Sequence, residues 1–211
     1  MCIRDRVSHR RLSNGDDKPY ELNISWWSAM EDSSRDSNRF QFERFILTQL
    51  LVMALKGVPA FYLPALLASE NDIKSFSMTG QRRDLNREKF KSDILSSVLN
   101  NPESNANKNL KYLRNAMNVR SELKQFHPCS EMKCLSKGRS DIVVIKRDKG
   151  TKSVFAIHNI TENKINYQLN DNDLPKIIDN DFNTYDFLTS TKYNCKNISL
   201  DPFQVIWLSA L

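Results

Sequence analysis

The feature that most constrains this chain is an apolar run, Val58 to Leu67, that leads into a long polar segment. The run is too short to cross a membrane and is interrupted by Pro59 and Pro64, so we expect a short buried strand. The segment from Ser69 to Lys89 is crowded with acids, amides and arginines. Such a set at a strand end suits the binding of hydroxyl and carboxylate groups, although a solvated surface loop explains the same composition.

Three separated motifs surround this run: YELNISWWSAM (Tyr20 to Met30), LLVMALKGVPAFYLPALLASEND (Leu50 to Asp72) and TGQRRDLNREKF (Thr79 to Phe90). In this order and near this spacing, they resemble the sucrose phosphorylase group of the alpha-amylase superfamily, glycoside hydrolase family 13. The resemblance is close from Val7 to Pro128 and looser beyond. A single GVP before an apolar strand would be weak, whereas three motifs in the family's order are specific.

The resemblance implies an α/β fold: the end of a (β/α)8 TIM barrel, with its last strand and helices, followed by a small antiparallel β domain. Residues Ser37 to Lys56 would form the helix before the eighth barrel strand, and Val58 to Leu67 would contain that strand. The segment Ser69 to Lys89 would then be the loop that closes over the sugar. The chain is therefore expected to be a carboxyl-terminal fragment.

The expected division of the chain follows from this plan. Residues 1–6, MCIRDR, look like a translated sequencing-adapter remnant and are left out of the fold, with a short native arm as the alternative. Residues 7–128 are expected to be the carboxyl-terminal part of the catalytic barrel. Residues 129–211 are expected to form the antiparallel β domain.

The activity implied by the resemblance is that of a sugar phosphorylase, a glycosyltransferase. The parent protein would transfer a glucosyl group from an α-glucoside, such as sucrose or glucosylglycerate, to inorganic phosphate with retention, and would need no metal or organic cofactor. The three catalytic acids are expected upstream of residue 1, so this fragment alone is predicted to be inactive. The alternatives are a related α-glucoside hydrolase and a non-catalytic basic binding module.

The candidate substrate-binding residues are Arg83, Tyr20, Glu21, Asn71, Asp72 and Arg87. Arg83 aligns, within RRDLNR, with an arginine that contacts the bound glucosyl unit in the resembled group, and its planar fork suits vicinal hydroxyls or a carboxylate. Tyr20 and Glu21 align with a mobile loop that lines the acceptor subsite. An acid at the second position puts sucrose in doubt and disfavours a phosphorylated acceptor beside it, by like-charge repulsion.

The other candidates have structural explanations that fit equally well. Asn71 and Asp72 match the start of the family's loop, but a helix or turn cap accounts for both. Arg87 is expected to hold the loop in shape, and Arg82 is expected to face solvent. His127 and His158 are interpreted as structural histidines.

Charge, apolar run length and cysteine spacing indicate which classes of binding partner to expect. The chain has 31 Lys plus Arg against 25 Asp plus Glu, a formal charge of +6. Its basic residues are interleaved with Glu122 along the predicted helix at 107–125 and are not stacked on one face, so we expect no nucleic-acid partner. No apolar stretch reaches membrane-spanning length, and we expect a cytoplasmic protein with no membrane partner and a possible homodimer. The four cysteines, at 2, 129, 134 and 195, lack metal-ligand spacing and are read as reduced thiols.

Local patterns place the remaining elements. A helix begins near Ser37 or Asn38 and ends at Gly57, a polar surface loop with an Asn14-Gly15 turn spans Ser8 to Tyr20, and the Trp26-Trp27 pair anchors a packed segment. Further helices are expected at 90–99 and 107–125, the second burying Leu110, Leu113 and Met117. Short strands are expected at 142–146, 153–159, 164–169 and 204–208, and the polar segment Asp171 to Asn183 is expected to be an exposed connection.

Overall fold

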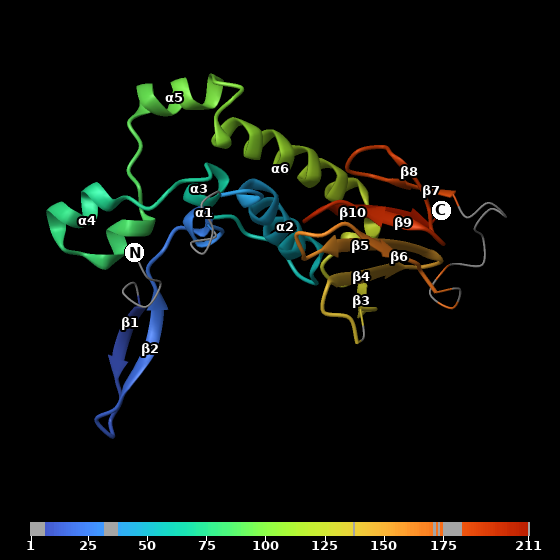
Figure 1. Ribbon diagram of the computed structural model, residues 1–211, viewed down its shortest axis with the longest axis horizontal. Coiled ribbons are helices and arrows are strands. Elements are labelled where there is room, and N and C mark those ends of the chain that lie inside the picture. The colour runs from blue at the N-terminus through green and yellow to red at the C-terminus, as the bar shows by residue number, and fades with distance from the viewer. Residues whose placement is uncertain are drawn as a thin grey trace. The chain divides into compact units, whose positions relative to one another are not determined.

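The computed structural model describes residues 7–31, 38–136, 138–170, 172, 174 and 183–210. The chain forms two compact units (Figure 1): the first unit is Met1–Asn38 with Phe61–Lys111, and the second unit is Arg39–Ala60 with Tyr112–Leu211. The division expected between residues 128 and 129 stays a prediction. Most of the predicted connection at 171–183 lies outside the described residues, as do residues 1–6 and Ser37.

The second unit is built on an antiparallel sheet, as the sequence predicts. Six strands pair in the order β3-β4-β5-β10-β7-β8, and two more, β6 and β9, form a separate pair. The bounds are β3 Glu131–Cys134, β4 Ile142–Lys149, β5 Lys152–Asn159, β6 Ile165–Tyr167, β7 Asn183–Asp186, β8 Lys192–Asn194, β9 Ile198–Leu200 and β10 Val205–Ala210. The four predicted strands correspond to β4, β5, β6 and β10.

The core of the second unit lies around β5. Seven of its eight residues are buried, so both faces of this strand are covered, and its sequence is accordingly apolar on both sides. One face packs into a cluster that includes Phe155, Ile157, Ile206 and Leu208. Trp207 of β10 is fully buried, and its ring lies 4.7 Å from that of Phe126, centroid to centroid. The sheet therefore carries the largest share of buried apolar surface in this unit.

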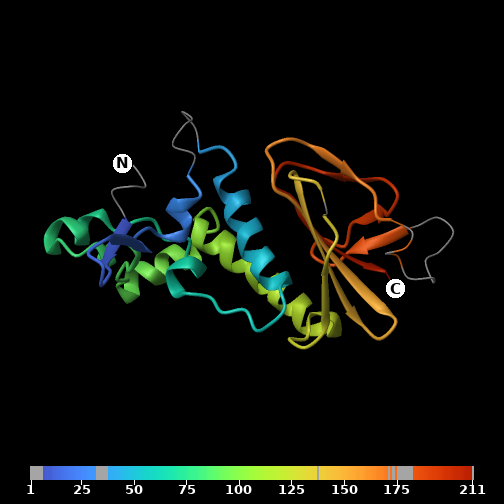
Figure 2. The ribbon, with the colours of Figure 1, turned by 90° about the horizontal axis from the view of Figure 1, so that it is seen from below.

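Helix α2, Gln41–Ala54, lies next to the sheet and contacts β5 (Figure 2). Phe45, Leu50 and Met53 of this helix recur at helical spacing and are buried. Both predicted ends are wrong by a few residues. The N-cap is Phe40, in the left-handed region with φ 65° and no side-chain cap hydrogen bond, and the helix ends at Ala54, before Gly57.

A buried arginine ties the end of α2 to the sheet. Arg147 of β4 is fully buried, and its guanidinium donates to the backbone oxygens of Ala54 (3.0 Å), Leu55 (2.8 Å), His127 (2.8 Å) and Glu131 (3.3 Å). Carbonyl groups at a helix carboxyl end lack partners within the helix, and they carry partial negative charge. Arg147 satisfies two of them directly, which explains how a charged side chain is accommodated in this core.

The first unit begins with a hairpin where a polar loop was predicted. Strands β1, Val7–Arg11, and β2, Asp17–Leu22, pair antiparallel, and the predicted Asn14-Gly15 turn connects them with Gly15 at φ 91°. The polar sequence misled the prediction because both faces of this ribbon are largely exposed and carry no apolar alternation. Helix α1, Trp26–Ala29, follows, with Trp27 buried in accord with its predicted packing role.

The apolar run is not a strand. Residues 58–62 have no regular secondary structure, Val58 is exposed, and α3, Leu63–Leu66, occupies the second half of the run. A buried parallel strand needs neighbours to receive its backbone hydrogen bonds, and no described strand pairs with this segment. Pro64 instead starts a helical turn, and Asn109 Nδ2 donates to the carbonyls of Ala65 and Leu66.

The polar segment that follows is helical rather than a loop. It contains α4, Ile73–Thr79, and the 3-10 helix η2, Arg82–Asn86, because Asp72 caps the first and Gly80, at φ 67°, ends it. The later helices are α5 Ser92–Asn100, α6 Asn105–Glu122 and the 3-10 turn η3 Lys124–Phe126. The predicted helices at 90–99 and 107–125 match α5 and α6, but Met117, expected to be buried, is exposed. No helix within the described ranges combines the length and the apolar character that a bilayer crossing requires.

Candidate functional site

All six predicted substrate-binding residues belong to the first unit, and its 3-10 helix η2 brings two of them together. Arg83 Nε lies 3.4 Å from Glu21 Oε2 on β2, across 62 positions of sequence. The neighbouring Arg82 Nη1 donates to the backbone oxygen of Val7 on β1 at 2.7 Å, although its side chain is exposed as expected. Consecutive arginines therefore hold η2 against both strands of the hairpin.

The Arg83–Glu21 ion pair is weak enough to exchange partners. The two side chains are 56% and 30% exposed, and ion pairs of this kind contribute about 0–1 kcal/mol. A guanidinium has five donors in a planar fork, so a single contact at 3.4 Å leaves most of them available to a ligand. Arg83 is thus positioned and charged, but it is not committed to Glu21.

Tyr20 lies in an irregularity of the hairpin. Ser8 pairs with Glu21 and His9 pairs with Pro19, so Tyr20 is the extra residue of a β-bulge. Its side chain is 63% exposed. Bulges turn a side chain away from the regular alternation and are frequent beside binding sites. Tyr20 therefore has an accessible ring and directly precedes Glu21 of the ion pair in the sequence. Its role toward a ligand stays a prediction.

Asn71 and Asp72 are engaged within the protein. Asn71 Oδ1 accepts from the Ser25 amide at 2.7 Å, and the Asn71 amide donates to Ser28 Oγ at 3.1 Å, which ties this segment to α1. Asp72 caps α4, where the hydroxyl and amide of Ser75 lower the pKa of its carboxyl group. The cap interpretation accounts for Asp72, and Asn71 ties the segment to α1, while a ligand role for either residue stays a prediction.

Arg87 is the residue at which η2 ends, and its expected role in holding this segment in shape stays a prediction. Its amide donates to the Asp84 oxygen at 3.3 Å and its side chain is exposed. Leu85 is the buried residue of η2, and its backbone oxygen accepts a hydrogen bond from the Asp72 amide at 2.9 Å. Asp84 Oδ2 accepts from Thr79 Oγ1 at 2.6 Å, which links η2 to α4.

Two residues near these contacts were missed by the sequence interpretation. Asn23 is fully buried and its Nδ2 donates to Ser8 Oγ at 2.8 Å, which braces the base of the hairpin. Burial raises the pKa of the Glu88 carboxyl, and the nearby charges of Asp72 and Glu70 add to the shift. Nothing in a single sequence distinguishes Asn23 from a surface amide, whereas the density of acids around Glu88 was a visible signal.

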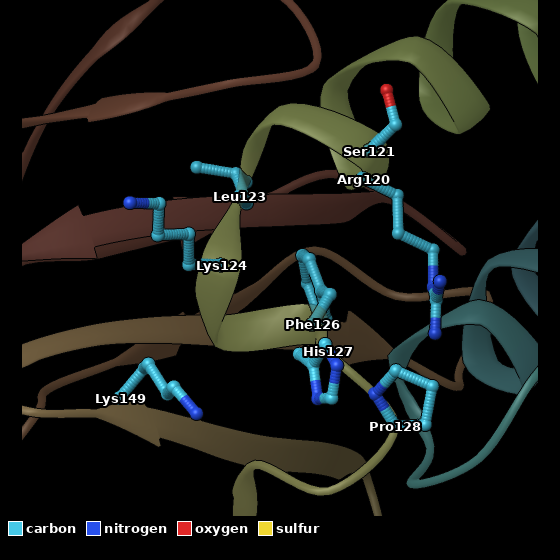
Figure 3. Close-up of a pocket in the computed structure, with 8 residues that line it drawn as sticks. All are labelled: Arg120, Ser121, Leu123, Lys124, Phe126, His127, Pro128 and Lys149. Atoms are coloured by element: carbon cyan, nitrogen blue, oxygen red, sulfur yellow. The ribbon is translucent and has the colours of Figure 1, made fainter.

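A basic pocket in the second unit is the feature that most favours the binding-module alternative. It encloses about 450 Å³, and its lining includes Arg120, Lys124, His127 and Lys149 around the Phe126 ring (Figure 3). The side chains of Arg120 and Lys124 leave the backbone in opposite directions in this view. Arg120 also donates to the carbonyls of Met53 and Gly57 at 3.0 Å each. This pocket is cationic without converging donors, so it gives the alternative little support.

Comparison with known proteins points to one group of enzymes. No protein-family model matches the chain. A glucosylglycerate phosphorylase of Allomeiothermus silvanus is 30% identical over 158 residues, which is 74% of this chain and 28% of that protein. A glucosylglycerate phosphorylase of Escherichia coli is 22% identical over 96% of this chain and 34% of that protein. The chain therefore spans about a third or less of the length of these curated relatives.

Solved structures agree on the fold. AmyP in complex with maltose matches with a TM-score of 0.66 at 15% identity, over 83% of this chain and 36% of that one. A sucrose 6F-phosphate phosphorylase from Thermoanaerobacter thermosaccharolyticum matches with a TM-score of 0.55 at 18% identity, over 75% and 30%. The fold is that of the carboxyl-terminal part of an alpha-amylase-type barrel enzyme. Together with the sequence matches, this confirms a sucrose phosphorylase-like carboxyl-terminal region of glycoside hydrolase family 13.

Proposed function

We propose that the protein to which this region belongs is a retaining sugar phosphorylase that transfers a glucosyl group from an α-glucoside to inorganic phosphate. The single observation that carries the proposal is the match of this chain to glucosylglycerate phosphorylases over 74% and 96% of its length. Glucosylglycerate is therefore the first donor to test, and sucrose is the second. The parent protein is proposed to act in the cytoplasm on these small molecules.

In the proposed reaction, a carboxylate expected upstream of this chain attacks the anomeric carbon, and the glycosidic oxygen leaves with a proton from a general acid. A phosphate oxygen then attacks the same carbon and releases the carboxylate, so glucose 1-phosphate forms with retention. This region would supply contacts to the sugar and the leaving group rather than the reacting carboxylates. Arg83 is the group best placed among the predicted residues to bind vicinal hydroxyls.

The Arg83–Glu21 pair bears on the choice of acceptor. An isolated acid at position 21 would repel an anionic leaving group such as glycerate. With Arg83 Nε at 3.4 Å, the pair carries no net charge, and that objection is reduced. Movement of Arg83 onto a glycerate carboxylate would leave Glu21 to accept hydroxyl donors, a division of roles that suits glucosylglycerate.

The test is a phosphate-dependence assay on the protein completed with its upstream sequence. We expect glucosylglycerate to be converted to glucose 1-phosphate and glycerate, with the rate rising with phosphate concentration. Free glucose released at the same rate without phosphate would support the α-glucoside hydrolase instead. Absence of turnover on any α-glucoside would contradict both enzyme assignments.

A matched pair of variants connects the activity to this region. Arg83→Ala should lower kcat/KM for the glucoside at least tenfold, because a charge-assisted contact to the sugar is removed (about 1.4 kcal/mol for each tenfold). Arg82→Ala, which removes a contact to the Val7 backbone, should change it by less than about threefold. Equal losses in the two variants would show that the hairpin contact, rather than sugar binding, explains the effect.

A further inference from the structure

A second pocket of the second unit is lined by aromatic rings and acids, and neither the sequence nor the proposed reaction accounts for it. It encloses about 430 Å³, within the range of about 300–1,000 Å³ common for small-molecule sites. Its aromatic lining is Phe40, Phe42, Tyr112 and Phe203. The carboxylates of Glu43 and Asp201 also line it.

Two strained residues meet at this pocket. Phe40 and Phe203 both have positive φ, at 65° and 54°, a conformation that is uncommon for bulky residues and costs of order 1 kcal/mol each. Their rings lie 5.6 Å apart between centroids and are inclined at 59°. These residues come from distant parts of the chain, the start of α2 and the turn before β10. Strain kept at two such positions that face each other is typical of a functional site.

Two arginine side chains contact the Phe40 and Phe203 rings. Arg39 lies over the Phe40 ring at 4.5 Å, and Arg44 lies over the Phe203 ring at 5.6 Å. The turn that carries Phe203 is closed by Asp201, whose amide donates to Gln204 Oε1 at 2.8 Å. A fixed pair of rings costs little entropy when a ligand binds, so this platform is organised in advance.

Polar groups around the rings match a hydroxyl-rich ligand. Glu43 and Asp201 offer carboxylate oxygens that accept from hydroxyl groups. Burial and the charge of Asp186 raise the pKa of Tyr112 to about 12, so its phenol stays a hydrogen-bond donor at neutral pH. Asp201 Oδ1 also pairs with Lys164 Nζ at 3.1 Å, which leaves its second oxygen for a ligand. A purely apolar ligand would leave these acceptors unpaired and fits less well.

We propose that this pocket is a binding site for a neutral saccharide, whose C–H face packs on Phe40 and Phe203 while its hydroxyls donate to Glu43 and Asp201. The proposal does not depend on the phosphorylase assignment, because every residue that it uses lies in the second unit. It adds a second sugar-binding surface to the chain.

The alternative explanation is that the two rings only pack the start of α2 onto the turn before β10. Substitution by glycine separates the explanations, because glycine adopts positive φ without strain. Under the packing explanation, Phe203→Gly loses stability and has no binding to lose. Under the saccharide explanation, it loses binding, while relief of backbone strain offsets much of the lost ring packing.

The experiment is a titration of the 211-residue chain with maltose, followed by isothermal calorimetry and by NMR. We expect saturable binding by the unsubstituted chain and at least a tenfold rise in Kd for Phe203→Gly, since loss of a stacked ring removes about 1.4 kcal/mol or more. Glu43→Gln, at an exposed position in the first turn of α2, should also weaken binding. Thermal unfolding of each variant reports any loss of structure.

Two controls keep the result specific. Ser190→Gly relieves a positive φ of 61° elsewhere in the second unit and should leave Kd unchanged. Arg139→Ala, which removes an exposed pair with Asp141, should also leave it unchanged. The proposal is overturned if maltose does not bind, if Phe203→Gly and Glu43→Gln bind it as the unsubstituted chain does, or if inorganic phosphate binds the pocket more tightly than maltose.

Discussion

The two units of the chain differ in how they treat their apolar side chains. In the second unit, β5 is covered on both faces, and Trp207, Phe155 and Leu208 are almost fully buried. In the first unit, helix α5 has no buried residue, and Leu22, Tyr62 and Leu63 are each about half exposed. The predicted substrate-binding residues all belong to the unit with less burial. The residues predicted from the motifs to bind substrate therefore lie outside the part of the chain that buries most of its apolar side chains.

The contrast has a physical cause. A six-stranded sheet with a helix beside it satisfies its backbone groups and buries its apolar face within one unit. The first unit has a two-stranded hairpin and short helices, and such elements seldom bury enough surface to be stable alone. Three substitutions and one change of pH test this difference, and they are given in decreasing order of the expected change in stability.

Arg147→Ala should destabilise the second unit by about 3–5 kcal/mol, because it leaves buried carbonyls at the end of α2 and near η3 without donors. Chemical denaturation followed by tryptophan fluorescence measures the change. The matched control is Arg139→Ala, which removes an exposed pair with Asp141 and should cost less than about 1 kcal/mol. Equal effects of the two substitutions would contradict the assigned role of Arg147.

Acidification should destabilise the second unit through His158. Burial lowers the pKa of His158 from 6.5 to about 4, so between these values the unfolded chain binds a proton that the folded chain does not. The free energy of unfolding therefore falls as pH falls through this window, by about 2 kcal/mol between pH 6.5 and pH 5. The slope should flatten in His158→Gln and persist in the exposed control His9→Gln.

Asp72→Ala should loosen α4 by about 1 kcal/mol, because the cap hydrogen bond to the Ser75 amide is lost. Hydrogen exchange should show faster exchange in α4 and η2 and no change in the sheet of the second unit. Asn14→Ala, which removes a turn contact to Asp16 in the hairpin, is the control within the same unit. Loss of protection throughout both units would show that they do not open independently.

Arg83→Ala should change the free energy of unfolding by less than about 0.5 kcal/mol, because its pair with Glu21 is exposed. Thermal unfolding measures this small effect. The variant is informative because the same substitution is expected to reduce activity of the complete protein at least tenfold, as stated above. A stability loss comparable to that of Arg147→Ala would instead make Arg83 a structural residue.

The sequence predicts the second unit better than the first for the same physical reason. Strands β4, β5 and β10 carry continuous apolar runs because they are buried, and helix α2 shows its buried stripe directly. The hairpin β1–β2 has no such pattern, so its strands were not predicted. The apolar run at 58–67 has the composition of a buried strand, but no described strand lies beside it to form backbone hydrogen bonds.

For the candidate site, the motif resemblance selected Arg83 and Glu21, which the fold brings into contact. It could not show that Asn71 and Asp72 are engaged with Ser25 and Ser75, because caps and ligand contacts use the same residue types. Arg147 was missed because a buried arginine with carbonyl partners looks, in sequence, like any charge in a strand.

The most direct test of the central claim is the DNA sequence upstream of the codon for Val7, recovered from the source by outward amplification. We expect an open reading frame in the same frame that encodes the earlier strands of a barrel with three catalytic acids. A stop codon in that frame immediately before this region would contradict it and would leave a chain without the carboxylates that glucosyl transfer requires.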